Sequence, residues 1–250
     1  RLQVNVTSTL GLQPVVNARV GIAYTGESQR LLEELQTDSS GQTEAVTLDA
    51  PPVEYSQEPD QPQPFSEYTV TVQAEGYRSV EVSAIDVFAN VTALQEIRME
   101  PLDISKGEGM ENIVVPPNTL WGDFPPKIPE EEVKPVNETG EIVLSRVVIP
   151  EYVIVHDGPP TDTRARDYYV RYRDYIKNVA SSEIYATWPE DTIRANVLAI
   201  MSFTLNRVYT EWYRNKGYDF TITSSTAFDH KWIYGRNIFD SISNIVDELF

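Results

Sequence analysis

The chain has 250 residues, a formal net charge of −18 and 41% hydrophobic residues, a proportion typical of folded globular proteins. It contains no cysteine, which excludes disulfides, thiolate metal sites and a cysteine nucleophile. The excess of acidic residues lies in the first 150 residues. Its negative field would repel a polyanion, so a nucleic-acid partner is disfavoured. The alternative interpretation is that the charge only aids solubility. No apolar run approaches the roughly 18 residues that cross a bilayer, so no membrane span is predicted.

Residues 1–101 predict an all-β domain. Apolar residues alternate with polar ones or cluster in five stretches: 2–7, 16–24, 68–72, 80–88 and 94–99. Asp38–Gly41 has the composition of a turn. Residues 51–65 contain five prolines and therefore cannot form a central strand. Short strands at this spacing favour a β-sandwich.

Four segments of this domain carry a family resemblance. They are PVVNARVGI, TDSSGQT, YTVTVQAEGYRSVEV and TALQEIRMEP. Their order resembles the carboxypeptidase regulatory-like (transthyretin-like) sandwich family. Modules of that family are usually non-catalytic, so the resemblance implies a structural role for residues 1–101.

Residues 102–150 are interpreted as a proline-rich linker with a charge run at 130–132. Apolar runs at 142–144 and 147–149 flank Ser145-Arg146, and 153–155 forms another. These runs predict one or two strands that pack on the following domain. Alternatively, an exposed part of the connection is a processing site, because protease-accessible segments concentrate in linkers.

Residues 151–250 are predicted to be mainly helical, which makes the whole chain a multidomain α+β protein. Three helices are expected: from Asp162 or Asp167 to about 183–185, from Pro189 to Gly217, and from about Asn237 onward. The second has a wide apolar surface and is predicted to be the buried central helix. Residues 220–226 are expected to form a short strand or loop.

Glu183 is the main candidate for catalysis. Tyr172, Ile176 and Val179 precede it at spacings that place all four residues on one helical face. A carboxyl group on the apolar side of a helix is costly to ionise, so its pKa is raised, as a general acid requires. The alternative is a helix-end carboxylate that only caps the helix or forms an ion pair with Lys177 or Arg194.

Other catalytic arrangements have weaker support in the sequence. A Ser-His-Asp triad with Ser181 or Ser182 would have to use one of the two histidines, His156 or His230. No cluster has metal-ligand spacing and no glycine-rich phosphate loop is present, so no metal and no cofactor are predicted.

Aromatic residues are dense around Glu183. They are Tyr168, Tyr169, Tyr172, Tyr175, Tyr185 and Trp188. Exposed aromatic faces stack on pyranose rings, so Tyr185 and Trp188 are candidate contacts to a sugar polymer. The alternative is plain core packing. Ser182, next to Glu183, is a further candidate substrate contact.

The segment VASSEIYATWPEDTIRANVLAIMSFTLNRV resembles the signature of the stage II sporulation protein D family. Residues 120–158 and 172–230 resemble the clostridial spore cortex-lytic enzymes, which are peptidoglycan lytic transglycosylases made as proenzymes. With the sandwich included, this resemblance covers essentially the whole chain. It implies that Glu183 is the catalytic acid. The segment TITSSTAFDHKWIYG matches the loop that lines the family's substrate groove, which implies substrate contacts from Thr223, Ser224, Ser225 and Asp229.

The resemblance also implies how the protein is made and where it acts. The sandwich and linker would be a pro-region, removed by a subtilisin-like spore protease near Ser145, Arg146 and Val147. The expected location is the spore cortex, an extracytoplasmic wall, and the expected substrate is peptidoglycan glycan strands. Some sporulation protein D relatives bind zinc through His and Cys; only His230 remains here, so no zinc is expected. Family members continue past the position of Phe250, which implies that the catalytic domain is truncated here.

Three functions therefore remain open. The first is a lytic transglycosylase precursor that cleaves the muramic acid–glucosamine bond during germination, with Glu183 as general acid and base. The second is a non-catalytic peptidoglycan-binding or spore-coat structural protein. The third is a hydrolytic muramidase that uses Glu183 and Asp229 as a pair.

Overall fold

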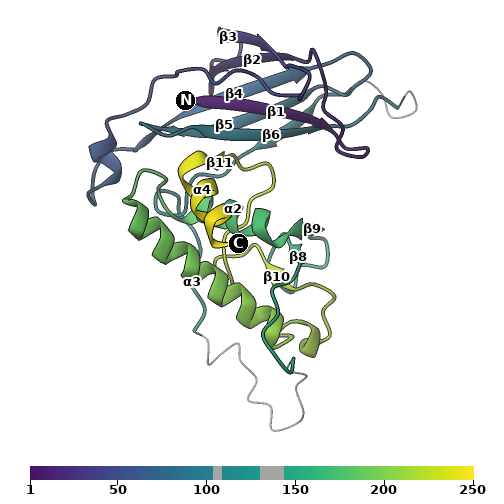
Figure 1. Ribbon diagram of the computed structural model, residues 1–250, viewed down its shortest axis with the longest axis vertical. Helices are drawn as coiled ribbons and strands as arrows, with labels where there is room; N and C mark the ends of the chain where they lie inside the picture. The colour runs from purple at the N-terminus through teal and green to yellow at the C-terminus, as the bar shows by residue number, and fades with distance from the viewer. Residues whose placement is uncertain (104–108, 130–143) are drawn as a thin grey trace. The chain divides into compact units, whose positions relative to one another are not determined.

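The computed structural model describes residues 1–103, 109–129 and 144–250, which form two compact units (Figure 1). Unit 1 contains Arg1–Pro117, Tyr185–Trp188 and Tyr234–Ser241. Unit 2 contains Asn118–Ile184, Pro189–Ile233 and Ile242–Phe250. The first unit extends past the boundary predicted at residue 101, and both units include residues from the predicted linker.

The larger sheet of unit 1 has five strands in the order β3-β2-β4-β5-β7. The strands are β2 (Arg19–Tyr24), β3 (Leu31–Gln36), β4 (Phe65–Gln73), β5 (Val80–Phe88) and β7 (Glu111–Val114). Neighbours are antiparallel except β5 and β7, which are parallel. The apolar residues of β4 that alternate in the sequence, Tyr68, Val70 and Val72, are fully buried, as a half-buried strand requires.

A second sheet of unit 1 contains β1 (Leu2–Ser8), β6 (Ala93–Met99) and β11 (Ile238–Phe239), in the order β1-β6-β11. Burial alternates along β1, with every second side chain enclosed. The rings of Phe88 in β5 and Phe239 in β11 are 5.2 Å apart, so both sheets contribute to one core. The short 3₁₀ helix Val53–Ser56 lies in the proline-rich connection between β3 and β4.

Unit 2 combines a small sheet with the three α-helices of the described chain. Its strands are β8 (Tyr152–His156), β9 (Asp167–Arg171) and β10 (Ile222–Thr223), in the order β10-β8-β9. The helices are α2 (Tyr172–Glu183), α3 (Glu190–Tyr209) and α4 (Asp240–Leu249), with a 3₁₀ turn at Arg214–Lys216. The first two residues of α4 belong to unit 1.

The predicted fold class is wrong for the C-terminal part, which is not mainly helical. The three helices hold fewer than half of residues 151–250, and the rest is strand and irregular structure. The first predicted helix starts too early, because Asp167–Arg171 form β9 and pair antiparallel with β8. Their Tyr-Tyr-Val sequence suits a strand, and the available partner strand decides the outcome.

The second predicted helix also differs from expectation. Pro189 precedes it as the N-cap rather than as a residue of its first turn, and the helix ends at Tyr209, before the predicted stop at Gly217. Only one face is buried, by Ile193, Val197 and Ile200 among others. Leu198 is 46% exposed, so α3 is not a buried central helix. The last helix begins at Asp240 rather than near Asn237, because the two residues before it form β11.

Other local predictions have mixed outcomes. The turn at 38–41 is confirmed: the Asp38 carboxylate accepts hydrogen bonds from Ser40 and from the Gln42 amide, and Gly41 has φ +79°. The predicted strand at 153–155 is part of β8, whereas 147–149 is irregular and exposed. The run at 142–144 and the charge run at 130–132 lie outside the described residues, except for Leu144.

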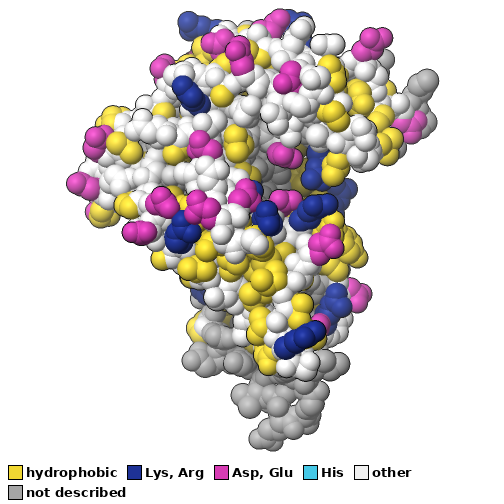
Figure 2. Space-filling view, viewed as in Figure 1, with side chains coloured by type: hydrophobic (Ala, Val, Ile, Leu, Met, Phe, Trp, Pro, Cys, Tyr) yellow, Lys and Arg dark blue, Asp and Glu magenta, His cyan; other side chains and the backbone are white. Residues whose placement is uncertain are grey.

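The surface of unit 1 carries exposed acidic side chains, among them Glu27, Glu33 and Glu44, and Figure 2 shows such side chains among uncharged ones. None of the described helices combines the length and apolar character needed to cross a membrane.

Candidate active site

Glu183 is the last residue of α2 and belongs to unit 2. The helix ends there because Ile184 adopts an extended conformation. The amide of Asn118 donates to the carbonyl oxygens of Ile184, at 3.0 Å, and Ser181, at 3.4 Å. These bonds satisfy carbonyl groups that a helix end leaves unpaired, and so define where α2 stops.

The Glu183 carboxylate is partly buried and accepts one hydrogen bond from a backbone amide, that of Lys231, at 2.6 Å. Burial raises the pKa of Glu183 to about 7, although the Lys231 amide and the Lys127 ammonium both favour the charged form. At neutral pH the group is therefore divided between its acid and its carboxylate form. A carboxyl in that condition can give a proton and later take one back.

The simpler alternative for Glu183, an ion pair with Lys177 or Arg194, is wrong. Lys177 instead pairs with Asp247 at 2.8 Å. Arg194 pairs with two other glutamates, Glu190 at 2.9 Å and Glu248 at 2.6 Å.

The Tyr175 phenol and the Lys127 ammonium both interact electrostatically with Glu183. Tyr175 is fully buried, and burial together with the charges of Asp229 and Glu183 raises the pKa of its phenol. The Lys127 ammonium lies 4.5 Å from the centre of the Phe203 ring. These groups come from α2, α3 and the 118–129 segment.

Asp229 is a buried structural carboxylate in this arrangement. Its side chain is 0% exposed and accepts four hydrogen bonds. Arg207 Nε donates to one oxygen at 2.9 Å. The other oxygen accepts from the Tyr213 hydroxyl at 2.6 Å and from the amide and hydroxyl of Thr223 at 2.9 and 2.7 Å. With its oxygens occupied in this way, Asp229 is not placed to act as a second catalytic carboxylate.

The other residues predicted in the groove-lining loop serve to hold it together. Thr223 is buried on Asp229, and its hydroxyl also lies 3.4 Å from the amide of Ser225. Ser224 is 2% exposed and donates to Asp157 at 2.8 Å. The Ser225 carbonyl accepts the Asp229 amide at 2.8 Å. The structure thus brings Thr223, Ser225 and Asp229 together as a closed loop.

Ser182 is fully buried, and its hydroxyl donates to the Asn178 carbonyl one turn earlier, at 2.8 Å. The His156 ring nitrogens lie 2.7 Å from an Asp167 carboxylate oxygen and 3.1 Å from the Asp162 carbonyl. Burial lowers the pKa of His230 to about 4. No hydrogen bond found among the described residues joins a serine hydroxyl to either histidine, which argues against a triad.

Tyr185 and Trp188 are part of unit 1 and are not grouped with Glu183. The Trp188 indole donates to the Ser56 carbonyl at 2.8 Å, and the Tyr185 ring lies 5.5 Å from Phe88. Both residues are half-buried, so each packs within unit 1 and remains partly exposed.

The predicted processing residues Ser145, Arg146 and Val147 are all exposed and outside regular structure. Val147 is 61% exposed. Just before them, the Leu144 amide bonds to the Tyr209 carbonyl at 3.0 Å. Exposed, irregular chain of this kind is accessible to proteases.

Sequence reasoning missed three residues near Glu183: Lys127, Asn178 and Lys231. Lys127 lies in the proline-rich segment, and Lys231 contributes through its backbone, so neither has a local sequence signal. Asn178 is one of several polar residues of α2 and nothing in the sequence distinguishes it. No cluster of three or more potential metal-binding side chains occurs in the parts of the chain that the structure describes.

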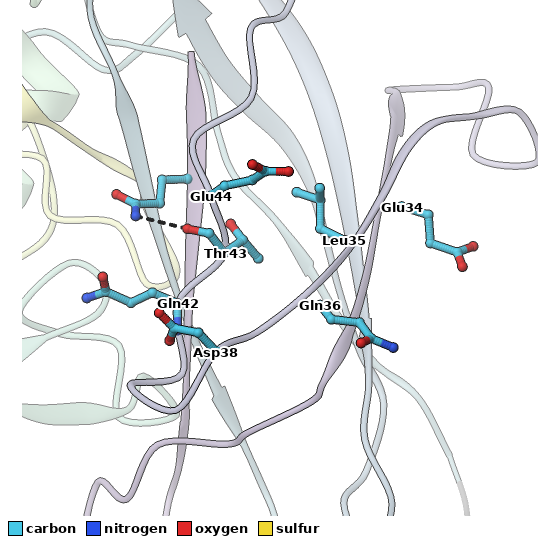
Figure 3. Close-up of a pocket in the computed structure, with 8 residues that line it drawn as sticks. Glu34, Leu35, Gln36, Asp38, Gln42, Thr43 and Glu44 are labelled. Carbon is cyan, nitrogen blue, oxygen red and sulfur yellow. Dashed lines mark hydrogen bonds between the residues drawn. The ribbon is translucent and has the colours of Figure 1, made fainter.

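A separate hollow of about 680 Å³ occurs in unit 1 (Figure 3). It is lined by Gln3, Glu34, Leu35, Gln36, Asp38, Gln42, Thr43 and Glu44. Two of its carboxylates are already engaged, Glu34 with Arg19 at 2.6 Å and Asp38 within its turn. Nothing in it resembles a catalytic arrangement.

Comparison of the sequence with protein-family models and with curated proteins gave no match. Among solved structures, the chain is similar to a 5-hydroxyisourate hydrolase from Klebsiella pneumoniae, with 15% identity over 41% of this chain and 91% of that one, at a TM-score of 0.26. It is also similar to an (S)-allantoin synthase, with 11% identity over 39% of each chain and the same TM-score of 0.26. At TM-scores this low, neither similarity supports an inference about fold or activity.

Proposed function

We propose that this chain is the precursor of a lytic transglycosylase that cleaves spore cortex peptidoglycan, with Glu183 as both general acid and general base. The choice of Glu183 as the proton-transfer group rests on one observation, whereas the substrate class rests on the resemblance of residues 172–230 to the spore cortex-lytic family. Glu183 is a partly buried carboxyl whose pKa is raised to about 7, and it accepts a hydrogen bond from the Lys231 backbone amide. Such a group is suited to proton transfer at neutral pH.

The proposed reaction needs one carboxyl group. Protonated Glu183 gives its proton to the glycosidic oxygen between muramic acid and glucosamine, and that bond breaks. The 6-hydroxyl oxygen of the same muramic acid then bonds to the anomeric carbon and closes an anhydro ring. The Glu183 carboxylate takes the hydroxyl proton and is restored to its acid form. No water is consumed.

The surroundings of Asp229 support transglycosylation over hydrolysis. A hydrolytic muramidase normally needs a second carboxylate as base or nucleophile. Asp229 was the sequence's candidate for that role, but its oxygens accept four hydrogen bonds inside unit 2.

The proposal includes activation by proteolysis. The exposed segment around Ser145, Arg146 and Val147 is where a subtilisin-like spore protease would cut. The site of action would be the cortex, an extracytoplasmic wall, and the partner would be glycan strands.

The test is digestion of purified cortex peptidoglycan with the processed protein, followed by mass spectrometry of the released muropeptides. Anhydro-muramic ends, lighter than reducing ends by one water, are expected. Glu183→Gln should lower the rate at least about 100-fold, because general acid catalysis contributes that much or more. Glu190→Gln, an exposed glutamate at the start of α3, is the matched control and should keep the wild-type rate.

Reducing ends would replace the proposal with a hydrolytic muramidase. Binding to the wall without cleavage would replace it with a non-catalytic wall protein. An unchanged rate in Glu183→Gln would remove Glu183 from the mechanism.

A further inference from the structure

Asn178 holds a distant segment of chain against α2. Its side chain is buried, with 8% exposure. Its amide nitrogen donates to the Ile233 carbonyl at 2.9 Å, and its amide oxygen accepts the Ile233 amide at 2.9 Å. One side chain therefore satisfies both backbone polar groups of a residue 55 positions away.

The held residue lies next to the hydrogen bond of the candidate acid. Lys231, two residues before Ile233, donates its backbone amide to Glu183 at 2.6 Å. The segment 231–233 is neither helix nor strand, so no sheet ladder fixes it. Asn178 and Glu183 are thus two points of α2 that bind this segment, one near the middle of the helix and one at its end.

We propose that Asn178 is a positioning residue for Glu183: by holding Ile233, it directs the Lys231 amide at the carboxylate and fixes the orientation in which Glu183 transfers its proton. The role of Asn178 in catalysis rests on the proposed function, whereas its effect on the pKa of Glu183 does not depend on that function. Asn178 itself touches no reacting atom in this proposal.

The charged and titratable groups that act on Glu183 come from several elements. The Lys127 ammonium and the Lys231 amide favour the carboxylate, and the buried Tyr175 phenol lies close enough to interact with it. A hydrogen bond to the charged form lowers a carboxyl pKa, so weakening the Lys231 bond raises it. Loss of the Asn178 clamp should raise the pKa of Glu183 by about one unit, the change expected when one hydrogen bond to a carboxylate is lost.

The experiment is a carbon-13 NMR titration of the Glu183 carboxyl in the whole chain, assigned with Glu183→Gln. Asn178→Ala should shift the titration midpoint upward by about one pH unit. Asn215→Ala is the matched control, because Asn215 also donates its side-chain amide to a backbone carbonyl of unit 2, that of Thr210. It should leave the midpoint unchanged. An unshifted midpoint in folded Asn178→Ala would overturn the proposal.

Activity gives a second readout that a purely structural role would not produce. The alkaline limb of the pH–rate profile should move upward with the midpoint, and kcat should fall about tenfold with little change in KM. Loss of activity with an unmoved alkaline limb would contradict positioning. If the wild-type chain proves inactive while the NMR shift occurs, the proposed function fails and the effect of Asn178 on Glu183 stands.

The wild-type protein provides a test that needs no variant. The Lys231 amide proton should follow the Glu183 titration with the same midpoint, and the Ile233 amide should be protected from hydrogen exchange. If Asn178→Ala does not fold, these two signals decide the matter. A Lys231 amide that ignores the titration, or a rapidly exchanging Ile233 amide, would overturn the proposal.

Discussion

Asp229→Asn is expected to destabilise unit 2 severely. Asp229 is 0% exposed, and its partner Arg207 is 5% exposed. The substitution leaves the guanidinium buried without an opposing charge. It also places an amide group where three donors, two from Thr223 and one from Tyr213, meet on one carboxylate oxygen. Whichever way the new amide is turned, its NH₂ faces at least one donor.

The magnitude follows from the loss of a buried ion pair. Removing one partner of such a pair costs about 3–5 kcal/mol, because the remaining charge stays desolvated. A typical domain has about 5–15 kcal/mol of total stability, so the variant should lose a large fraction of it. The exposed Asp219→Asn changes the net charge equally and should stay within about 0.5 kcal/mol of the wild type.

The assay is urea unfolding of the wild type and both variants, followed by far-ultraviolet circular dichroism. A loss below about 1 kcal/mol in Asp229→Asn would refute the structural role of this carboxylate. If that stable variant also failed to digest peptidoglycan, Asp229 would be a second catalytic carboxylate, and the one-carboxyl mechanism would be wrong.

Three other outcomes are expected. Glu183 has a folded-state pKa raised from 4.5 to about 7, so wild-type stability falls as pH rises through that window; Glu183→Gln should be the more stable form above it, by at most about 3 kcal/mol. Denaturation at both ends of the window checks this, and an advantage that did not vary with pH would contradict it. Arg236→Met should lower the free energy of unfolding by about 3–5 kcal/mol, because it leaves the fully buried Asp86 without its opposing charge. Adding Asp86→Leu should recover most of this stability in the same unfolding assay. A double variant as unstable as the single one would argue against the ion pair. After proteolysis within the exposed 144–149 segment, β6 lies in the N-terminal piece and β11 in the C-terminal piece, and their pairing should make the two pieces co-elute in gel filtration. Separate elution would show that this pairing does not hold the pieces together.

Much of unit 1 could be predicted because its strands have a local pattern. Alternation of apolar and polar residues predicts β1 and β4, and the turn sequence from Asp38 to Gly41 predicts its own hydrogen bonds. The sequence does not reveal β3, an edge strand that is exposed along most of its length and so shows no alternation. Nor does it reveal β7, whose four residues follow a stretch interpreted as linker.

The helices of unit 2 show where local patterns fail. Pro189 predicts the start of α3, because proline is favoured before or within a first helical turn. The residues Tyr168–Val170 were predicted to be helical, but they pair with β8 instead. A wide apolar surface on α3 predicted complete burial, whereas the surrounding chain covers one face only.

The sequence by itself predicted that the pKa of Glu183 is raised, because the helical face that carries this carboxyl is formed by residues a few positions apart. Only the tertiary structure decided which groups meet there. The Lys231 amide comes from 48 residues away and the Asn178 clamp spans 55. Tertiary structure also determines the role of Asp229, whose carboxylate accepts hydrogen bonds from Arg207, Tyr213 and Thr223 and is thereby a structural group. In unit 1, Arg236 donates a hydrogen bond to Asp86, which lies 150 residues earlier in the sequence. Such contacts depend on how distant segments pack, and no local pattern of spacing encodes them.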